Sequence, residues 1–338
     1  MNRALVRLLE DRADELRERH GISWRITGIA SRRLGWIADP AGLDSAVLLN
    51  LKAETDGGSS QAEPALSLSK EAPASQKSTN VREWLTAAQA NILFEATSLN
   101  VQDGQPAVDY VRAALQLGAH AITANKGTIV HAYRELRDLA AARGRKFLFE
   151  STVMDGVPIF SLFDQLPAIH LNGFYGILNS TTNVILSEME QGLSFDAALK
   201  KAQALGVAET DATHDIDGWD AAVKTAALIT VLMDVPIRLE DIDREGIREL
   251  TTEGVRNARR DGWPFKLVCR ARRVGGGVKA SVAPEKVLSS SAMGKIAGTS
   301  SYINFETDIF PGLAVTEENP GVYATAYGML ADFIRAVS

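Results

Sequence analysis

The chain has 338 residues, a formal net charge of -6 and 46% hydrophobic residues, a composition typical of a soluble protein long enough for two domains. The mixed charge provides neither the basic surface that binds nucleic acid nor a basic amphipathic face for a membrane, and no apolar run is long enough to span one. The first residues predict a charged helix instead of a signal peptide, and the single cysteine, Cys269, is interpreted as a core residue in a reducing cytoplasm.

The first part of the chain predicts alternating helices and strands. Residues 2–20 have the apolar spacing of an amphipathic helix that ends at Gly21, and WRITGIA at 24–30 is interpreted as a buried strand. Residues 53–80, rich in Ser, Ala, Glu and Gln, are interpreted as a flexible insert. The elements expected beyond it are helices at 81–89, 107–117 and 128–143 and strands at 91–97, 120–124 and 146–152. This alternation predicts an α/β domain built on a doubly wound, Rossmann-like parallel sheet.

The alternation ends near residue 150, where we place the start of a second domain. Helices are expected at 180–192 and 194–206, and an acidic loop then leads into an apolar helix that begins at Asp217 or Gly218. The segments expected toward the C-terminus are two strands joined at VGGG within 264–287 and a helix at 320–336. That last helix could pack back on the first domain.

The sequence has one feature that favours a nucleotide and one that does not. A doubly wound sheet that binds a dinucleotide normally has G-x-G-x-x-G between its first strand and first helix, and this chain has no such motif. We interpret this as a chain that lacks the first strand and the phosphate loop. The strand at 24–30 is followed by Ser31, Arg32 and Arg33, and arginine at this point accommodates the 2'-phosphate of NADP. A solvated pair of arginines is the alternative.

Three further motifs stand where ligands can bind. TANKG follows a strand, so Asn125 and Lys126 are expected at the carboxyl edge of the sheet, where the lysine either holds an anion or is an ordinary surface residue. ESTVMDGVP begins at Glu150 and offers oxygens suited to a hard cation, with a plain turn as the alternative. GILNSTTN places hydroxyl and N–H groups at a helix start, suited to a carboxylate or to simple capping by Ser180 or Thr181.

An acidic stretch, ETDATHDIDGWDAAVK, precedes one lysine at the start of an apolar helix. Its carboxylates are Glu209, Asp211, Asp215, Asp217 and Asp220. Asp220 and Lys224 are four residues apart and could form an ordinary ion pair on one helical face. Because the helix continues as TAALITVLM and should be buried, we favour a site for an amino acid, with acids for its ammonium group and a lysine for proton transfer. A divalent metal is disfavoured, since His214 is the only histidine nearby and Lys224 would oppose the cation.

Taken together and in this order, TANKG, ESTVMDGVPIF, GILNSTTN, LGVAETDATHDIDGWDAAVK and IAGTSSYINFETDI resemble homoserine dehydrogenase from residue 2 to the end, apart from 53–80. The resemblance implies NAD(P)-dependent interconversion of L-homoserine and L-aspartate 4-semialdehyde in threonine and methionine biosynthesis. It implies a nucleotide-binding domain at 1–149, completed by 312–338, and an α+β substrate-binding and dimerisation domain at 150–311. The expected cofactors are NADP, or NAD, and a monovalent cation such as sodium or potassium. The expected assembly is a homodimer or a dimer of dimers.

The resemblance also assigns roles to individual residues. Lys224 would exchange the proton with the substrate oxygen, and Lys126 would lie close to the same centre. The implied substrate contacts are Glu209, Asp215, Asp220 and Thr181. The implied cofactor contacts are Ser31, Arg32, Arg33, Thr97, Asn125 and Lys126. The implied cation ligands are Glu150 and the backbone carbonyls of Val153, Asp155 and Val157.

Several features depart from the family pattern. Val207 stands where tyrosine is common, Ser180 stands where glycine is common, and EENPGVYATAYG replaces a glycine-rich stretch before the last helix. The family's first strand and glycine loop have no counterpart. The alternative function is therefore a truncated, non-catalytic fragment that dimerises and binds nucleotide poorly.

Overall fold

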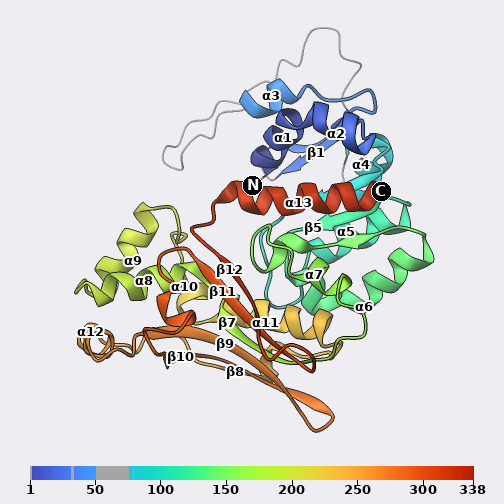
Figure 1. The fold of residues 1–338 in the computed structure, drawn as a ribbon. Helices are drawn as coiled ribbons and strands as arrows, with labels where there is room; N and C mark the ends of the chain where they lie inside the picture. Colours follow the sequence, from blue (N-terminus) through green and yellow to red (C-terminus); the bar gives the residue numbers. More distant parts are fainter. Residues whose placement is uncertain (1, 32–33, 51–75, 79) are drawn as a thin grey trace.

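Helices and strands alternate along the first part of the chain, and its strands include the parallel sheet that the sequence predicts (Figure 1). The computed structural model describes residues 2–31, 34–50, 76–78 and 80–338, so Arg32, Arg33 and most of the expected insert lie outside the described residues. Its helices are α1 (Asn2–Asp11), α2 (Ala13–His20), α3 (Ser45–Asn50), α4 (Val81–Ala88), α5 (Ala107–Gln116), α6 (Gly127–Ala142), α7 (Phe160–Asp164), α8 (Ser180–Glu190), α9 (Phe195–Ala204), α10 (Thr213–Ile216), α11 (Trp219–Leu232), α12 (Thr252–Arg260) and α13 (Val322–Val337). Its strands are β1 (Gly28–Ser31), β2 (Gly35–Ala38), β3 (Gln76–Lys77), β4 (Ile92–Glu95), β5 (His120–Thr123), β6 (Phe147–Leu148), β7 (Leu171–Ile177), β8 (Ile242–Arg244), β9 (Phe265–Val274), β10 (Gly277–Lys286), β11 (Ser301–Thr307) and β12 (Leu313–Glu317).

Strands β4, β5 and β6 run parallel in that order, and helices cover both faces of the sheet. Neighbouring residues of β5 pack on opposite faces. Ala121 belongs to a core cluster with residues of α5 and α6, whereas Ile122 packs with residues of α1 and α13. A parallel sheet buried on both faces is the doubly wound arrangement, so the predicted Rossmann-like fold class is confirmed.

The strand expected at 24–30 does not join this sheet among the described residues. It is shortened to β1 and pairs antiparallel with β2, whose other neighbour is β3. The chain turns back at Gly35, whose φ of +71° suits glycine, and the Ser31 hydroxyl accepts a hydrogen bond of 3.0 Å from the Leu34 N–H. The apolar run predicts a strand correctly, but such a run does not specify the pairing partner. β3 also lies within the segment that was expected to be a flexible insert.

The expected N-terminal helix is interrupted once. α1 and α2 together occupy 2–20, with Arg12 between them, and Gly21 ends α2 in the left-handed conformation that the sequence predicts. Leu5 and Leu9 are buried in a cluster with residues of α13. The expected C-terminal helix is thus present as α13, and it packs back on the first part of the chain.

After residue 150 the described residues form a second, mixed sheet in the order β12-β11-β7-β9-β10-β8. Neighbouring strands are antiparallel, except that β10 and β8 are parallel. The expected hairpin within 264–287 is confirmed as β9 and β10, which turn at Gly275 with φ of +58°. β7, β8, β11, β12 and α12 are not among the sequence predictions.

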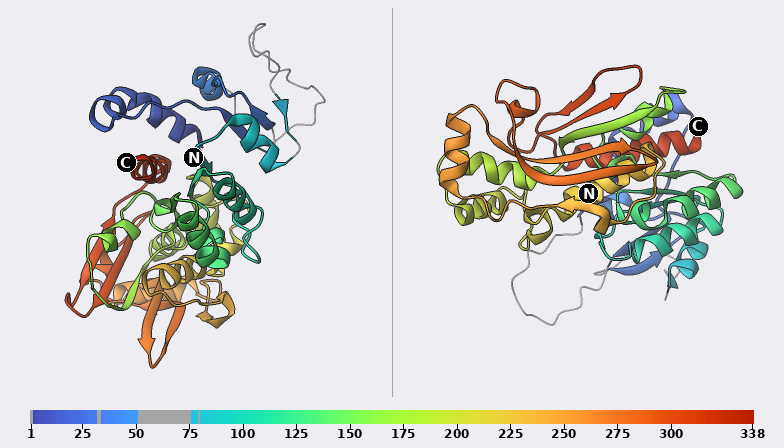
Figure 2. Two further views of the ribbon diagram at one scale, coloured as in Figure 1. Left: turned by 90° about the vertical axis from the view of Figure 1, so that its right-hand side faces the viewer. Right: turned by 90° about the horizontal axis from the view of Figure 1, so that it is seen from below.

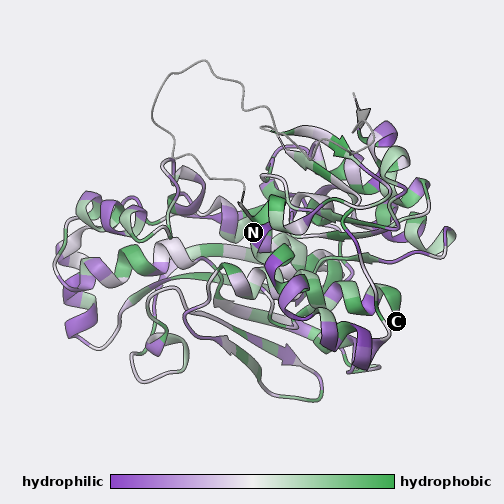
Figure 3. Ribbon diagram, turned by 90° about the horizontal axis from the view of Figure 1, so that it is seen from above, coloured by the Kyte–Doolittle hydropathy of each residue, from purple (hydrophilic) through white to green (hydrophobic). Residues whose placement is uncertain are grey.

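Helix α11 links the two parts of the molecule. It packs on β9 and β10 and also on α6, and its residues from Thr225 to Thr230 are buried. Helix α13 crosses between α1 and the parallel sheet, and the left view of Figure 2 shows it nearly end on, with α1 and α3 on one side. In Figure 3 the helices at the margins of the molecule carry polar residues beside apolar ones, as expected for helices with one buried face.

Candidate active site

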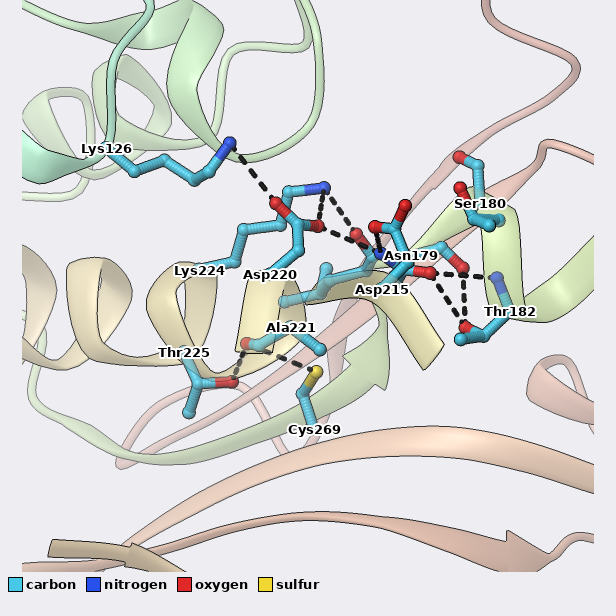
Figure 4. A network of polar contacts seen from close by, with 12 residues as sticks. Lys126, Asn179, Ser180, Thr182, Asp215, Asp220, Ala221, Lys224, Thr225 and Cys269 are labelled. Carbon is cyan, nitrogen blue, oxygen red and sulfur yellow. Dashed lines mark hydrogen bonds and ion pairs between the residues drawn. The ribbon is translucent and has the colours of Figure 1, made fainter. Parts of the chain in front are cut away.

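The carboxylate of Asp220 lies at the centre of a charged cluster (Figure 4). Lys224 Nζ is 3.0 Å from Asp220 Oδ2, and Lys126 Nζ is 3.3 Å from Asp220 Oδ1. The amide of Asn179 also donates to Asp220 Oδ2 at 3.0 Å. These partners come from α11, from the residue before α6 and from the residue before α8. The i, i+4 pair expected from the sequence is therefore part of a contact between the two parts of the molecule.

The start of α11 places this carboxylate where water is largely excluded. Gly218, at φ of +80°, precedes the helix and turns the chain into it, and Asp220 follows in the first turn. The side chains of Asp220 and Lys224 are only 18% and 17% exposed. Charges so poorly hydrated are tolerated only when they are paired, which the two lysines and the Asn179 amide achieve.

The two acids of the cluster titrate in opposite directions. Burial acts to raise the pKa of Asp220, but Lys224 and then Lys126 outweigh it and hold that pKa well below its usual range. Burial raises the pKa of Asp215, and the neighbouring charge of Asp220 raises it further. The cluster therefore contains one firmly ionised carboxylate beside a second that binds a proton more readily.

Lys224 is held in its charged form. Its Nζ donates to the Leu178 carbonyl at 2.7 Å as well as pairing with Asp220. Burial acts to lower the pKa of Lys224, but the attraction of Asp220 outweighs it, and the net shift is upward. A change in the partners of Asp220 would therefore change how readily Lys224 releases its proton.

Asn179 joins the two acids to α8. It caps this helix by accepting a hydrogen bond from the Thr182 N–H at 2.8 Å, and its amide nitrogen donates to Asp215 at 2.6 Å as well as to Asp220. The GILNSTTN motif thus caps a helix, but the capping residue is Asn179 and not Ser180 or Thr181, and the same side chain also contacts the acidic cluster. Thr181 is buried next to it, and its hydroxyl donates to the Val207 carbonyl at 3.2 Å.

The ends of β4 and β5 are tied together beside the cluster. Asn125 is 3% exposed, and its amide nitrogen donates to the carbonyls of Thr97 and Ser98 at 3.1 and 3.3 Å. Its side-chain oxygen accepts from the Gly127 N–H at 2.9 Å. Thr97, Asn125 and Lys126 therefore gather at the carboxyl edge of the parallel sheet, the place that the sequence predicts for ligand contacts.

Two predicted contact residues lie outside these interactions. Glu209 is exposed, and among the described residues its carboxylate joins none of the ion pairs of the cluster; its backbone carbonyl accepts from Gln203 at 3.2 Å. Ser31 ends β1 at the surface. Arg32 and Arg33 lie outside the described residues, so the predicted role of this pair stays a prediction.

The carboxylate predicted to help hold a cation is already hydrogen-bonded. Glu150 accepts from the N–H groups of Phe160 and Ser161 at 2.7 and 2.9 Å, where α7 begins, and lies 3.5 Å from an Arg335 nitrogen. A carboxylate at a helix N-terminus is favoured by the helix dipole. A cation in this loop would therefore depend mainly on backbone carbonyls.

The loop that would supply those carbonyls is fixed against α13. A Cβ atom added to Gly156 would lie 2.2 Å from the Ala324 carbonyl oxygen, so only glycine fits. Asp155 accepts a hydrogen bond from the Thr325 hydroxyl. Val153 is buried, and the Val157 carbonyl accepts from the Ile159 N–H at 2.8 Å. The four predicted cation ligands thus belong to one turn that packs closely against α13.

Glu317 is a charged residue near the cluster that the sequence reasoning missed. It ends β12, and its Oε2 is buried without a hydrogen-bond partner among the described residues. Burial, and then the charge of Asp155, raise the pKa of Glu317 to about 7, while Lys224 opposes the shift. The sequence signal was the EENPGV departure from the glycine-rich pattern, which was noted without a role.

We expect Glu317→Gln to weaken the dependence of stability on pH. The pKa of Glu317 is about 7 in the folded chain against 4.5 for an ordinary glutamate, so between these values the folded chain keeps a proton that the unfolded chain releases. Stability should fall as pH rises through this window, and glutamine should remove that part of the loss, about 1 kcal/mol for a half-buried group. Thermal unfolding at pH 5 and pH 8 measures it.

The exposed neighbour Glu318 supplies the matched control. Glu318→Gln changes the net charge equally but should leave the pH dependence as it is in the wild type. Identical pH dependence in the wild type and in both variants would show that Glu317 is hydrated and unshifted.

Comparison with known proteins identifies the family. The family model described as homoserine dehydrogenase matches residues 158–334, and the one described as the homoserine dehydrogenase NAD-binding domain matches residues 3–150. The chain belongs to the homoserine dehydrogenase family. Among relatives in this family, the NAD(+)-dependent homoserine dehydrogenase of Pseudomonas canavaninivorans is 33% identical over 99% of this chain and 93% of its own length. The homoserine dehydrogenase of Methanocaldococcus jannaschii is 30% identical over 99% of this chain and 95% of its own length.

Solved structures of homoserine dehydrogenases have the same fold. A putative homoserine dehydrogenase from Archaeoglobus fulgidus superposes with a TM-score of 0.82 at 27% identity, covering 98% of this chain and 95% of that one. A hyperthermophilic archaeal homoserine dehydrogenase mutant, in complex with NADPH, gives a TM-score of 0.80 at 28% identity over 99% and 93% of the two chains. The resemblance inferred from the motifs is thus confirmed.

Two further observations concern all the described residues. None of their helices is both long and apolar enough to cross a membrane. They also contain no group of three or more His, Cys, Asp or Glu side chains arranged to hold a metal ion.

Proposed function

We propose that this chain interconverts L-homoserine and L-aspartate 4-semialdehyde, with Lys224 moving the proton. The observation that carries the proposal is that Lys126, from the carboxyl edge of the parallel sheet, and Lys224, from α11, converge on the single carboxylate of Asp220. Parallel sheets bind nucleotides at that edge, so the cofactor and an amino-acid substrate would meet at this cluster. The full-length matches within an enzyme family favour this reading over a non-catalytic fragment.

The acids would bind the amino-acid end of the substrate. A substrate ammonium group needs a carboxylate in a poorly hydrated place, and Asp220 and Asp215 provide two that Asn179 holds side by side. The first turn of α8, with Thr181, would face the substrate carboxylate through its positive helix end. Glu209, from an exposed loop, would complete the ammonium site.

The proton would move between Lys224 and the substrate oxygen. In the reducing direction, charged Lys224 donates a proton to the oxygen of the aldehyde as it becomes an alcohol; in the oxidising direction, neutral Lys224 accepts it. When a substrate ammonium group shares Asp220, the attraction that raises the pKa of Lys224 weakens and proton release becomes easier. The charge of Lys126 would stabilise negative charge on the same oxygen.

The residues at the carboxyl edge of the sheet fit a nicotinamide cofactor. Asn125 is buried and holds the Thr97 and Ser98 backbone in place, which leaves a fixed polar surface beside Lys126. The cofactor, when bound, supplies or accepts the hydride. Thr97, Asn125 and Lys126 would hold its nicotinamide end.

We expect the purified chain to reduce NADP faster than NAD in the presence of L-homoserine. The support comes from the sequence and not from the parallel sheet, because β1 pairs with β2: the resemblance places Ser31, Arg32 and Arg33 at the cofactor ribose, and arginine favours the 2'-phosphate of NADP. One relative is described as NAD(+)-dependent and one solved homoserine dehydrogenase is in complex with NADPH, so both nucleotides must be tested side by side. The measurement is kcat/KM with each, from the absorbance of the reduced nicotinamide.

The same assay on Arg32→Ala separates the proposals. This variant should lose kcat/KM with NADP and keep it with NAD. A wild-type preference for NAD would contradict the cofactor proposal alone, whereas no homoserine-dependent reduction of either nucleotide would contradict the proposed reaction.

We also propose that the turn at 150–157 binds a monovalent cation through the carbonyls of Val153, Asp155 and Val157 and the residue Glu150. The turn offers several oxygens and packs closely against α13. Exchange of sodium or potassium chloride for tetramethylammonium chloride at equal ionic strength should lower the thermal midpoint, because a bound ligand stabilises the folded chain. An unchanged midpoint and unchanged rates would argue against a bound cation.

The arrangement of domains and subunits follows from the resemblance. We propose a nucleotide-binding domain at 1–149 completed by 312–338, a substrate domain at 150–311 that forms a homodimer or dimer of dimers, and a cytoplasmic location. The packing of α13 against α1 and β5 supports the return of the C-terminal segment to the first domain. Light scattering on the purified chain measures the assembly.

A further inference from the structure

Lys266, on β9, is a buried lysine that the mechanism does not use. It is 2% exposed, and its Nζ donates to the Ile296 carbonyl at 2.6 Å and to Asn183 Oδ1 at 3.1 Å. Burial lowers the pKa of Lys266, although the charge of Glu190 opposes that shift. Burial of a charged lysine costs desolvation free energy, so Lys266 is expected to make specific hydrogen bonds.

The partners of Lys266 belong to a junction between α8 and the segment 296–299. Asn183 donates to the Gly298 carbonyl at 2.8 Å, and the Ser180 hydroxyl donates to the Thr299 carbonyl at 2.9 Å. Two hydrogen bonds thus join the first turn of α8 directly to this segment, and Lys266 bridges the two through its bonds to Asn183 and the Ile296 carbonyl. Lys266 contributes to both sides of the junction, because it bonds α8 and the segment with one nitrogen.

The other side of the same short stretch of backbone faces the acidic cluster. Asn179, the capping residue of α8, donates to Asp215 at 2.6 Å and to Asp220 at 3.0 Å. The carbonyl of Leu178 accepts from Lys224 Nζ at 2.7 Å. Residues 178–183 therefore connect Lys266 to the cluster, and a shift of this turn would change the contacts of both acids. Figure 4 shows Asn179 beside Asp215 and Asp220.

We infer that Lys266 is a positioning residue, which fixes the first turn of α8 so that Asn179 holds the acids in register for the amino-acid end of the substrate. The inference rests on the proposed function. Loss of Lys266 should act on homoserine binding more than on nucleotide binding, because its contacts lead to α8 and not to the ends of β4 and β5. Lys266 itself touches no reacting group.

The test compares Lys266→Met with Arg273→Met in the full chain. Arg273 lies on the same strand and also bonds two carbonyls, those of Leu171 and Met233 at 2.9 and 2.7 Å, but it touches neither α8 nor the segment 296–299. Both variants lose a cationic side chain with two hydrogen bonds. We expect Lys266→Met to raise the KM for homoserine about tenfold or more while the KM for the nucleotide changes little. Arg273→Met should lower the thermal midpoint and leave both KM values unchanged.

A general structural role for Lys266 would give a different pattern. An equal change in both KM values, or a lower thermal midpoint with no change in the KM for homoserine, would overturn the inference. If Lys266→Met does not fold, Ser180→Ala removes one bond of the same junction, and an unchanged KM for homoserine in that variant would also overturn it.

Failure of the proposed reaction remains distinguishable from failure of this inference. If the wild-type chain binds homoserine in calorimetry but does not oxidise it, the proposed reaction fails. The inference then still predicts weaker homoserine binding by Lys266→Met than by Arg273→Met, and equal binding by the two would overturn it.

Discussion

Replacement of Lys224 by methionine should lower kcat/KM for homoserine by about 10²- to 10⁴-fold, the range that a proton-transferring side chain contributes. Methionine fills a similar volume in the buried first turns of α11 but has no ionisable proton to transfer. The fold should persist, because Asp220 keeps Lys126 at 3.3 Å and the Asn179 amide at 3.0 Å as partners. Steady-state rates in both directions of the reaction measure the effect.

Lys201→Met is the matched control for this prediction. Lys201 lies on α9 and forms an ion pair of 2.7 Å with Glu188, which places it away from the cluster. The Lys201→Met variant should retain wild-type kinetics. If Lys224→Met were as active as Lys201→Met, another group would have to move the proton.

A partial rescue would strengthen the assignment. Small primary amines can enter a space left by a lysine and accept or donate the same proton, so Lys224→Ala with added amine should recover some activity. The rescued rate should depend on the pKa of the amine, as Brønsted behaviour requires.

The local ion pair of the site was more predictable from the sequence than the contacts that distant parts of the chain make with it. The spacing of Asp220 and Lys224 on an apolar helix indicated a buried charged pair, and the structure confirms it. The contact of Lys126 with Asp220 joins residues far apart in the chain, and no local pattern encodes such a pairing. The family resemblance predicted that the two lysines lie near one centre, because it rests on motifs from distant parts of the chain.

In the fold, too, features set by local sequence were predicted and features set by long-range contacts were not. Helices such as α5, α6 and α8 follow from apolar periodicity, and they lie where the sequence predicts them. Capping contributes less to this agreement, because α5 and α6 have no side-chain cap among the described residues and α8 is capped by Asn179. β1 was predicted as part of the parallel sheet but pairs with β2, since strand partners are selected by long-range packing. Glu317 was missed for a similar reason. Its Oε2 becomes buried without a hydrogen-bond partner among the described residues only when β12 is folded.

Replacement of Asp220 by asparagine should shift the pH dependence of the reaction as well as reduce its rate. The attraction of Asp220 outweighs the effect of burial on Lys224, so without this charge the pKa of Lys224 should fall. Homoserine oxidation needs neutral Lys224, and its rise with pH should therefore move to lower pH in the variant. Aldehyde reduction needs charged Lys224, and its decline at alkaline pH should move the same way.

The same substitution leaves two lysines close together with no carboxylate between them. Lys126 and Lys224 are each about four-fifths buried and would repel one another, so the free energy of unfolding should fall by about 2–4 kcal/mol. The pKa of Asp215 should fall as well, because the charge of Asp220 is one of the causes that raise it. Asp215 would then ionise more readily and partly restore the binding of the substrate ammonium group.

Rate profiles across pH for Asp220→Asn and Asp215→Asn distinguish binding from proton control. Both variants should raise the KM for homoserine, since each loses a carboxylate beside the ammonium site. Asp220→Asn should move the pH at which kcat changes further than Asp215→Asn does, because Asp220 is paired with Lys224 and raises its pKa more than Asp215 does. Equal displacement of the profile in both variants would mean that the cluster titrates as one unit, and no displacement in either would mean that the proton on Lys224 does not control the rate.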